Sequence, residues 1–380
     1  MINNWQEVKL GEVLGKSGYI RGPFGSSLRR NELQSSGIPV YEQQHAIYND
    51  RTFRYFIDDE KYKELSRFTV RENDLIVSCS GTLGKISIIQ KDDPKGIISQ
   101  ALLILRPDVK VILPEYLYYF FTSPEGFYSL VSVSSGSVQV NLAKRSDIEK
   151  ITFNLPPLPE QRAIAGILGA LDDKIELNRR MNATLEAMAR AVFRRWFVEG
   201  EEVGNWEVKT IGDICEFAYG KGLKADGRNA GAIPVYGSNG QIGWHNEHLV
   251  KGPGIVVGRK GNPGIVTWAQ KDFFPIDTTF YVVPKDKETS LYWLYYTLIS
   301  KNLPYLGADS AVPGLNRNIA YTSDVNYPPY KIMKQYDEFT KPIFDKINAD
   351  DEESRTLARL RDALLPKLMR GEVRVKDIVS

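Results

Sequence analysis

The sequence has few of the residues on which disulfide-rich and metal-binding proteins depend. Its 380 residues include two cysteines, Cys79 and Cys215, and three histidines. Two cysteines in unrelated contexts are typical of a reducing cytoplasm and exclude a disulfide scaffold. No CxxC or HExxH motif is present, and the pair His245 and His248 has too few neighbouring ligands for a metal site. We therefore expect neither a structural disulfide nor a metal ion in this chain.

Long apolar runs and a leader segment are also missing. The longest apolar runs, such as Ala101–Leu105 and Ile255–Val257, are far shorter than the roughly 20 residues that a membrane span requires. The segment Met1–Glu12 has neither the basic nor the apolar stretch of a signal peptide. These absences predict a cytoplasmic protein without a membrane helix.

A charge excess of either sign is absent as well. Lysine and arginine number 49 against 47 acidic residues, which gives a net charge of +2. This balance neither requires nor excludes nucleic acid, because binding depends on a local basic face. The composition is that of a folded protein, and the length suggests two or three domains at about 150 residues each.

Motifs for catalysis are missing too. Gly11–Ser17 has three residues between its glycines where a phosphate-binding loop has four. Asn154–Pro157 and Asn326–Pro329 each have one residue too many before Pro-Pro to match the Asn-Pro-Pro motif of amino-methyltransferases, so stiff linkers explain them better. No GxGxxG motif follows a strand and no GxSxG motif occurs, and the sequence therefore predicts a protein without an active site.

What the sequence does contain is an internal duplication. Four segments recur in the same order: Trp5–Val13 as Trp206–Ile214, Gly37–Tyr41 as Ala232–Tyr236, Leu75–Ile86 as Ile255–Val266, and Tyr116–Tyr119 as Trp293–Tyr296. Further along, Pro156-Pro157 matches Pro328-Pro329 and Asp173–Ile175 matches Asp345–Ile347, both with an offset of 172 residues. The conserved order makes chance an unlikely origin and indicates two copies of one structural unit.

Each copy has a β-rich part followed by a long helix. Short Val, Ile and Tyr runs separated by Gly, Pro and Asn predict strands, with short helices at Pro114–Thr122 and Thr289–Leu298. Long helices are predicted at about Pro159–Phe197 and Met333–Met369, with Pro342 starting or kinking the second and Pro366 disturbing its last turn. Each would be about 60 Å long at about 1.5 Å per residue.

The long helices carry apolar residues at alternating steps of four and three, which is typical of a coiled-coil seam. The first seam consists of Ile164, Leu168, Leu171, Ile175, Asn178, Asn182, Leu185, Ala189, Val192 and Trp196. The second consists of Ile343, Ile347, Asp350, Ser354, Leu357, Leu364 and Leu368. In an antiparallel pair the polar residues of both seams meet and fix the register. In the alternative, Asn178 and Asn182 face solvent while Leu177 and Met181 make the contact.

The expected fold is α+β with an internal pseudo-two-fold repeat. Two β-rich domains, at residues 1–155 and 200–330, are separated by two long antiparallel coiled-coil helices, at residues 156–199 and 331–380. Two similar heads on a rigid spacer suit a protein that reads two separated DNA sites.

Loops that combine glycine with basic and amide residues are the candidate DNA contacts. Arginine and lysine neutralise phosphate or read guanine, and glutamine and asparagine pair with adenine. In the first β-rich domain these residues are Arg21, Ser26, Ser27, Arg29, Arg30, Gln43, Gln44, His45, Ser80, Thr82, Lys85, Gln139 and Asn141. In the second they are Lys221, Lys224, Ser238, Asn239, Gln241, Arg259, Lys260, Asn262, Asn316 and Arg317. The alternative is a set of ordinary solvated hairpin loops. The tyrosine pairs Tyr118-Tyr119 and Tyr295-Tyr296 are expected in the core.

The duplicated order resembles the specificity subunit of Type I restriction–modification systems. The resemblance covers the whole chain and is carried by Gly22–Leu28, Gly37–Val40, Ser80–Lys85, Leu155–Arg162 and Leu365–Gly371. It implies two target-recognition domains that each read half of a split DNA sequence, with the helices setting the gap. It also implies that two methylase subunits dock on the helices and that nuclease subunits join them. S-adenosylmethionine, ATP and magnesium would then belong to those partners.

Exposed arginines of the first long helix are candidates for partner docking. They are Arg179, Arg180, Arg190, Arg194 and Arg195, and the alternative is a solvated face with helix pairs such as Glu186 with Arg190. One departure from the family pattern is Met333–Glu338, where the first copy has Pro159-Glu-Gln, so docking at the second junction is less typical. Two rival functions remain: a two-headed protein scaffold that does not read DNA, and an enzyme.

Overall fold

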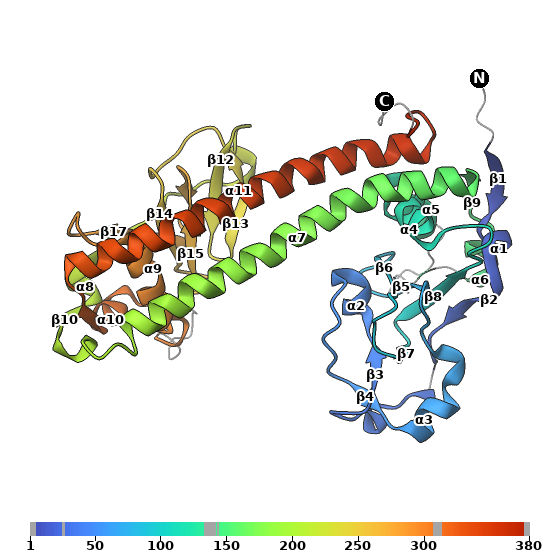
Figure 1. The fold of residues 1–380 in the computed structure, drawn as a ribbon, viewed down its shortest axis with the longest axis horizontal. Coiled ribbons are helices and arrows are strands. Elements are labelled where there is room, and N and C mark those ends of the chain that lie inside the picture. Colours follow the sequence, from blue (N-terminus) through green and yellow to red (C-terminus); the bar gives the residue numbers. More distant parts are fainter. Residues whose placement is uncertain (1–4, 25–26, 133–141, 143, 307–313, 376–380) are drawn as a thin grey trace. The chain divides into compact units, whose positions relative to one another are not determined.

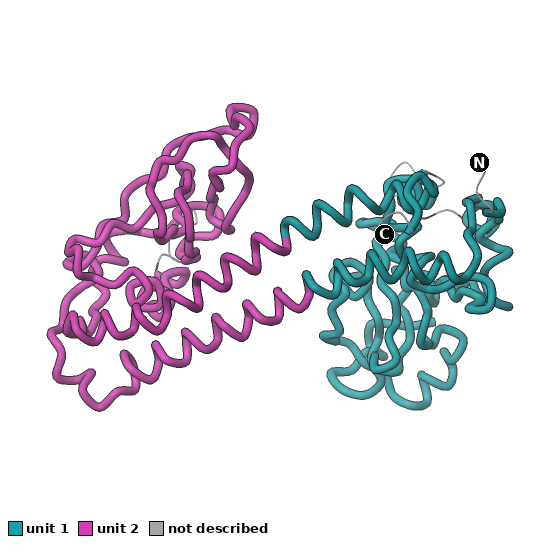
Figure 2. The backbone as a smooth tube through the Cα atoms, turned by 45° about the horizontal axis from the view of Figure 1, so that its top comes forward, with its two compact units in different colours: residues 1–175, 355–380 teal, residues 176–354 magenta. Residues whose placement is uncertain are grey.

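The computed structural model describes residues 5–24, 27–132, 142, 144–306 and 314–375. The chain forms two compact units, which Figure 2 distinguishes by colour. Unit 1 comprises residues 1–175 and 355–380, and unit 2 comprises residues 176–354. Each long helix therefore contributes one part to each unit.

Unit 1 is built on a four-stranded antiparallel sheet. Its strands lie in the order β2 (Leu14–Arg21), β8 (Leu102–Pro107), β5 (Leu75–Ser78) and β6 (Ile86–Ile88). Strand β5 is buried along its whole length, as its continuous apolar run predicts. Gly81 and Gly84, in the turn that leads to β6, adopt φ of 66° and 69°, a region in which glycine is favoured.

Two smaller sheets and short α-helices accompany this sheet in the described part of unit 1. The strands are β4 (Phe56–Ile57), β3 (Ile38–Tyr41) and β7 (Ile97–Ile98) in one sheet, and β1 (Gln6–Lys9) with β9 (Thr152–Leu155) in the other. The helices are α1 (Leu10–Val13), α2 (Gln43–Tyr48), α3 (Asp59–Glu64), α4 (Pro114–Thr122), α5 (Pro124–Ser132) and α6 (Arg145–Ile148). Helix α4 has the predicted bounds and starts with proline, whose missing N–H needs no partner in the first turn.

Unit 2 repeats this arrangement. Its four-stranded sheet has the order β11 (Cys215–Tyr219), β17 (Thr279–Pro284), β14 (Gly254–Gly258) and β15 (Val266–Ala269). The smaller sheets contain β13 (Gly240–His245), β12 (Ile233–Gly237) and β16 (Phe274–Pro275), and β10 (Glu207–Thr210) with β18 (Asp324–Tyr327). The short helices are α8 (Ile211–Ile214), α9 (Leu291–Ser300) and α10 (Arg317–Tyr321) (Figure 1).

The strand registers of the two units correspond, except for an irregularity in β2 between Leu14 and Tyr19 that β11 does not have. Leu14 pairs with Pro107 as Cys215 pairs with Pro284. On the other side of the central strand, Val77 pairs with Leu103 as Val257 pairs with Phe280. The predicted duplication is therefore confirmed at the level of sheet order and register. By the same pairing, Tyr219 of β11 occupies the position that Arg21 occupies in β2.

The long helices are α7 (Leu158–Phe197) and α11 (Tyr330–Met369). The bounds of α7 agree with the prediction to within one residue, but α11 begins before Met333 and continues through Pro342. The prediction that Pro342 starts this helix is therefore wrong. The missing hydrogen bond at Pro342 is offset by burial of Tyr336, Ile343 and Phe344 on either side. Pro366 also lies within the helix, and its carbonyl still accepts from the N–H of Arg370 at 3.1 Å.

Parts of both helices belong to the core of each unit. In unit 1, Ile164 and Leu168 of α7 and Leu368 of α11 pack with the sheet and α4. In unit 2, the core of the β-rich part includes residues of both helices, namely Ala189, Phe193, Phe197, Met333, Tyr336, Ile343 and Phe344. Trp196, which was assigned to the seam, is 36% exposed, because its neighbours Phe193 and Phe197 fill the core.

A polar layer joins the helices within unit 2. The side-chain amide of Asn178 donates to the carbonyl of Asp350 at 3.3 Å, to Glu353 Oε2 at 2.9 Å and to Ser354 Oγ at 3.2 Å. Asn182 donates to the carbonyl of Ile347, also at 3.3 Å. The predicted meeting of polar seam residues is thus confirmed in unit 2.

The alternative prediction, in which Asn178 and Asn182 face solvent while Leu177 and Met181 make the helix contact, is wrong. Asn178 is only 2% exposed, whereas Leu177 is 55% exposed and Met181 is 43% exposed. Further along the same two helices, the hydroxyl of Tyr336 donates to the carbonyl of Ala189 at 3.0 Å. Rising residue numbers on α7 therefore meet falling numbers on α11, and the two helices are antiparallel within unit 2.

Candidate nucleic-acid interface

The clearest candidate site is an open cleft of about 300 Å³ in unit 2. It lies where β11 meets the turn after β14 and the start of α10. Its lining includes Tyr219, Arg259, Lys260, Phe280, Asn316 and Arg317. Four of these residues were predicted from separate parts of the sequence, namely Arg259, Lys260, Asn316 and Arg317. The structure brings them together around a tyrosine that the prediction did not include.

Two arginines flank the ring of Tyr219, whose side chain is 55% exposed. The guanidinium carbon of Arg259 lies 5.4 Å from the ring centroid, and that of Arg317 lies 5.1 Å from it. Both distances are within the range of cation–π attraction. Tyr219 therefore positions two cations at the rim of one cleft.

Main-chain carbonyls hold the same two arginines. Arg259 donates to the carbonyl of Asp277 from Nε at 3.0 Å and from Nη2 at 2.7 Å. Arg317 donates from Nη1 to the carbonyl of Phe217 at 3.2 Å. Within the described ranges, neither arginine forms an ion pair with a carboxylate. The positive charge of both groups is therefore fixed in place by neutral partners.

The neighbouring loops of unit 2 are fastened by their own polar side chains. Ser238 Oγ donates to the carbonyls of Lys260 and Thr278, and the amide of Asn262 donates to the side-chain oxygen of Asn239. These bonds occupy Ser238 within the loop, so its role in the structure is to support the turn that carries Lys260. Three further predicted residues, Lys221, Lys224 and Gln241, are exposed.

The corresponding turn of unit 1 is held in a similar way. The side-chain amide of Gln43, on α2, donates to the carbonyls of Ser80 and Thr82, the latter at 3.0 Å. The Lys85 side chain is exposed and lies 5.6 Å from the ring of Phe127. Gln44 donates to the carbonyl of Thr52 at 3.3 Å. Gln43 therefore supports the turn that was predicted to contact DNA.

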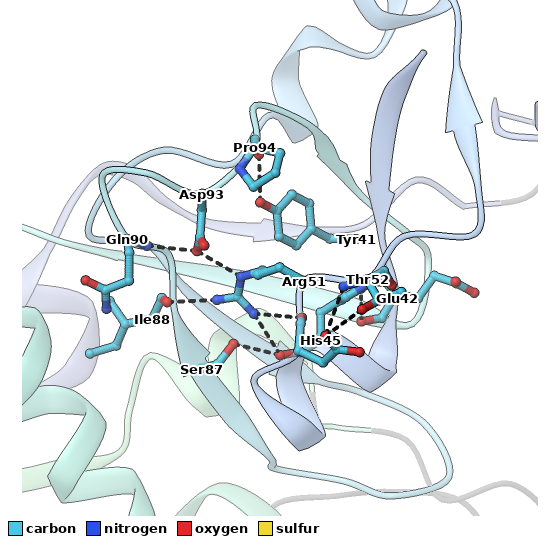
Figure 3. A network of polar contacts seen from close by, with 11 residues as sticks. Tyr41, Glu42, His45, Arg51, Thr52, Ser87, Ile88, Gln90, Asp93 and Pro94 are labelled. Carbon is cyan, nitrogen blue, oxygen red and sulfur yellow. Dashed lines mark hydrogen bonds and ion pairs between the residues drawn. The ribbon is translucent and has the colours of Figure 1, made fainter. Parts of the chain in front are cut away.

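His45 is part of a network of polar contacts inside unit 1, which Figure 3 shows. Its side chain is fully buried and stacks on Phe53, with ring centroids 4.6 Å apart. Nδ1 accepts from the N–H of Glu42 at 2.6 Å, and Nε2 lies 3.1 Å from the carbonyl of Thr52. The structure gives this ring no exposed surface to offer to DNA, in contrast to the predicted contact.

Arg51 fixes the loop around His45. Its Nε pairs with Asp93 at 2.9 Å, and its Nη1 and Nη2 donate to the carbonyls of His45 and Ile88 (Figure 3). The Ser87 hydroxyl donates to the same His45 carbonyl at 3.0 Å. This network ties α2 to β6 and so places the Gln43 side chain.

The first basic loop of unit 1 is only partly described. Arg21 is half-buried and lies over the ring of Phe24 at 5.7 Å, while Arg29 and Arg30 are exposed. Ser27 Oγ donates to the carbonyl of Phe24 at 2.9 Å. Three predicted contacts lie outside the described residues: Ser26, Gln139 and Asn141.

Arginines of α7 that were predicted to dock partners are exposed in unit 2. Arg179 and Arg180 both pair with Glu176, at 2.6 and 2.7 Å, and Arg194 pairs with Glu199 at 2.6 Å. Hydrogen bonds from Arg179 and Arg180 lower the pKa of Glu176 to about 2. The side chains of Arg190 and Arg195 are also exposed.

Tyr219 and Arg145 are residues that the sequence reasoning missed. Tyr219 lies just before the predicted residues Lys221 and Lys224, but an isolated tyrosine gives no sequence signal for exposure. Arg145 is the repeat equivalent of Arg317 by the 172-residue offset and lies over the ring of Tyr19 at 5.7 Å. The expectation that the tyrosine pairs belong to the core is confirmed for Tyr119 and Tyr296, which are 6% and 4% exposed.

The described part of the chain contains no group of three or more His, Cys, Asp or Glu side chains able to hold a metal ion. Cys79 and Cys215 are buried as free thiols, and burial raises the pKa of each to about 12. Such thiols do not ionise near neutral pH and are poor nucleophiles. Among the described helices, none combines the length and the apolar character that crossing a membrane requires.

Comparison with known proteins gives the family. The model of the Type I restriction modification DNA specificity domain matches this chain twice, over residues 2–187 and 204–351. The chain belongs to this family. The two matches also coincide with the two copies of the sequence duplication.

Several relatives align with this chain over nearly the whole of both sequences. The specificity subunit of the Type I restriction enzyme MjaIX from Methanocaldococcus jannaschii is 27% identical over 99% of this chain and 95% of its own length. The HindI specificity subunit from Haemophilus influenzae is 21% identical over 98% of this chain and 100% of its own length. The crystal structure of a Type I restriction–modification S subunit from M. genitalium superposes with a TM-score of 0.62 at 18% identity, covering 97% of this chain and 96% of that one. The likeness to that structure shows a shared fold.

Proposed function

We propose that this chain is the non-catalytic DNA sequence-recognition subunit of a Type I restriction–modification complex. The observation that carries the proposal is the duplicated specificity domain, with a basic cleft in unit 2 built from residues of three separate segments. The fixed arginines around Tyr219 suit DNA, because phosphate and base edges both attract preorganised guanidinium groups. A protein scaffold without DNA recognition has no such observation in its favour.

In this proposal each β-rich domain reads one half of a bipartite target. The domains are residues 1–155 and 200–330, and the spacer segments are residues 156–199 and 331–380. The long helices α7 and α11 form an antiparallel coiled coil that sets the gap between the half-sites. The contacts of Asn178 and Tyr336 with the opposite helix in unit 2 support this arrangement.

The partners would be two methylase subunits and the nuclease/translocase subunits. Docking of the methylases would use the exposed arginines of α7, and S-adenosylmethionine, ATP and magnesium would be bound by the partner subunits. The absence of a catalytic motif in the sequence agrees with a chain that recognises DNA while its partners act on it.

The test is DNA binding by the chain co-expressed with its methylase partners. We expect retention of one class of duplex in an electrophoretic assay even at raised salt, because salt weakens phosphate contacts while base contacts supply selectivity. Binding that ignores sequence at every salt concentration would contradict the proposal, as would methylation of DNA by this chain alone.

A further inference from the structure

The Tyr219 cleft of unit 2 holds two like charges close to one aromatic ring. Arg259 and Arg317 each lie within 5.4 Å of the ring centroid and are bonded to main-chain carbonyls. Lys260 adds a third cation to the lining, and none of the described residues that line the cleft carries a carboxylate. Like charges held together without a counter-ion favour the binding of an anion.

The repeat-equivalent position of unit 1 has a different charge balance. Arg145 corresponds to Arg317, and it pairs with Glu149 at 2.7 Å. The residue that corresponds to Glu149 by the same offset is Tyr321, whose ring lies 5.7 Å from Arg317. A carboxylate therefore neutralises the arginine in unit 1, whereas an aromatic ring leaves its counterpart charged in unit 2.

The hydrogen bonds of the arginines indicate which part of DNA the cleft would bind. Reading guanine requires two parallel donors of one guanidinium group. Arg259 already uses Nε and Nη2 on Asp277, and Arg317 uses Nη1 on Phe217. The donors that remain belong to two arginines at the rim of one cleft, and the several oxygens of a single phosphate can accept from both side chains, whereas a base edge pairs with one guanidinium group.

We propose that the Tyr219 cleft binds one backbone phosphate of the target DNA between Arg259 and Arg317. This inference rests on the proposed function and assigns the cleft a role in affinity and register, with base selection left to neighbouring loops. It also makes the two units unequal, since unit 1 has the buried Cys79 at the position of Arg259 and pairs Arg145 with Glu149.

The experiment measures DNA affinity against salt for the complex of the full chain with its methylase partners. The variants are Arg259→Gln, Arg317→Gln and the double variant, on a duplex that carries both half-sites. We expect each single variant to bind about tenfold more weakly, equally for the target and for non-specific duplexes. The double variant should lower the slope of log affinity against log salt by about one.

Two controls separate this effect from general loss of charge or fold. Lys287→Gln removes an exposed cation that lies beyond the Pro284 end of β17, whereas the cleft lies at the Phe280 end. This variant should leave the DNA affinity and the slope of log affinity against log salt nearly unchanged. Arg145→Gln changes the repeat-equivalent arginine and should have a smaller effect than Arg317→Gln. Thermal melting of each complex shows whether a variant remains folded. If Arg317→Gln does not fold, the test relies on Arg259→Gln alone.

A matched set of duplexes makes the outcome decisive. Replacing single phosphates by neutral methylphosphonates should identify one position at which wild-type affinity falls and the double variant is unaffected. Unchanged salt slopes in folded variants, or a changed base preference at one position, would overturn the phosphate assignment while leaving DNA recognition in place. Absence of selective binding by the wild type would instead contradict the proposed function itself.

Discussion

Residue 79 of unit 1 and residue 259 of unit 2 follow equivalent buried strands, yet one is a fully buried cysteine and the other a half-exposed arginine. Their main chains bond alike: Cys79 N–H donates to Ala101 and its carbonyl accepts from Leu142, as Arg259 does with Thr278 and Leu315. The duplicated backbone thus presents different side chains at the same place. Under the proposed function, one fold would in this way serve two different half-sites.

The comparison also shows which features the duplication preserves. Both turns after the central strand contain two glycines with positive φ, at Gly81 and Gly84 in unit 1 and at Gly261 and Gly264 in unit 2. Each turn is held by a polar side chain from a neighbouring segment: Gln43 donates to the carbonyl of Thr82, and Ser238 donates to the carbonyl of Lys260. The scaffold of the turn is therefore shared, while its exposed side chains differ.

The largest expected effect concerns α7 and α11, which each contribute a part to both units. Adding about one helical turn to both α7 and α11 should increase the distance between the two β-rich domains by about 5.4 Å. This corresponds to roughly one to two base pairs of DNA. The methylated target should then keep both half-site sequences with a changed gap. Mapping of methylated adenines in cells with the lengthened chain measures this, and an unchanged gap would show that the helices do not set it.

Exchanging the side chains at the two equivalent positions should affect stability in one unit only. Cys79→Arg would place an unpaired charge in a fully buried site and should lower the free energy of unfolding by about 3–5 kcal/mol. Arg259→Cys, at a half-exposed site, should cost about 1 kcal/mol or less. Denaturant unfolding compares the two, and equal losses would contradict the described difference in burial.

The polar layer of unit 2 offers a comparison within one helix. Asn178→Ala leaves buried acceptors on α11 without their donor and should destabilise the protein by about 1–3 kcal/mol. Asn182→Ala, at a half-buried position, should cost less. Unfolding measurements on both variants decide the order, and a reversed order would remove Asn178 as the principal residue of the layer.

The smallest expected effect concerns exposed ion pairs of α7. The pKa of Glu176 lies below its ordinary value of 4.5, at about 2, because Arg179 and then Arg180 bond to the charged carboxylate. Its contribution is therefore present above about pH 4.5 and lost as the pH falls toward 2. Glu176→Gln should cost under about 1 kcal/mol at neutral pH. This difference from the wild type should disappear in acid, and a constant difference across that range would contradict the assignment.

Much of the fold was predictable because the sequence encodes the same structural unit twice. Residues that recur at a fixed offset, such as Pro156 and Pro328, locate both domain junctions without any structure. Alternating apolar residues gave α7 nearly its full length. The start of α11 was predicted to within three residues, but the idea that Pro342 could start the helix was wrong, because burial of Tyr336 and Ile343 outweighs the local cost of this proline.

The candidate site was predictable in composition but not in assembly. Arg259 and Arg317 are 58 residues apart in sequence, and only the fold brings both to Tyr219, one after strand β14 and the other at the start of α10. His45 shows the opposite error: its position beside two glutamines suggests a contact loop, whereas packing on Phe53 buries it. Loop composition indicates chemistry, but burial is decided by residues distant in sequence.

The most direct test of the central claim is a map of methylated adenines across a host genome with and without this gene. If the chain is the specificity subunit, methylation should disappear at one bipartite motif, and the motif should supply both half-sites and their gap. Retention of every methylated motif in the strain that lacks the gene, with its methylase partners expressed and active, would contradict the claim.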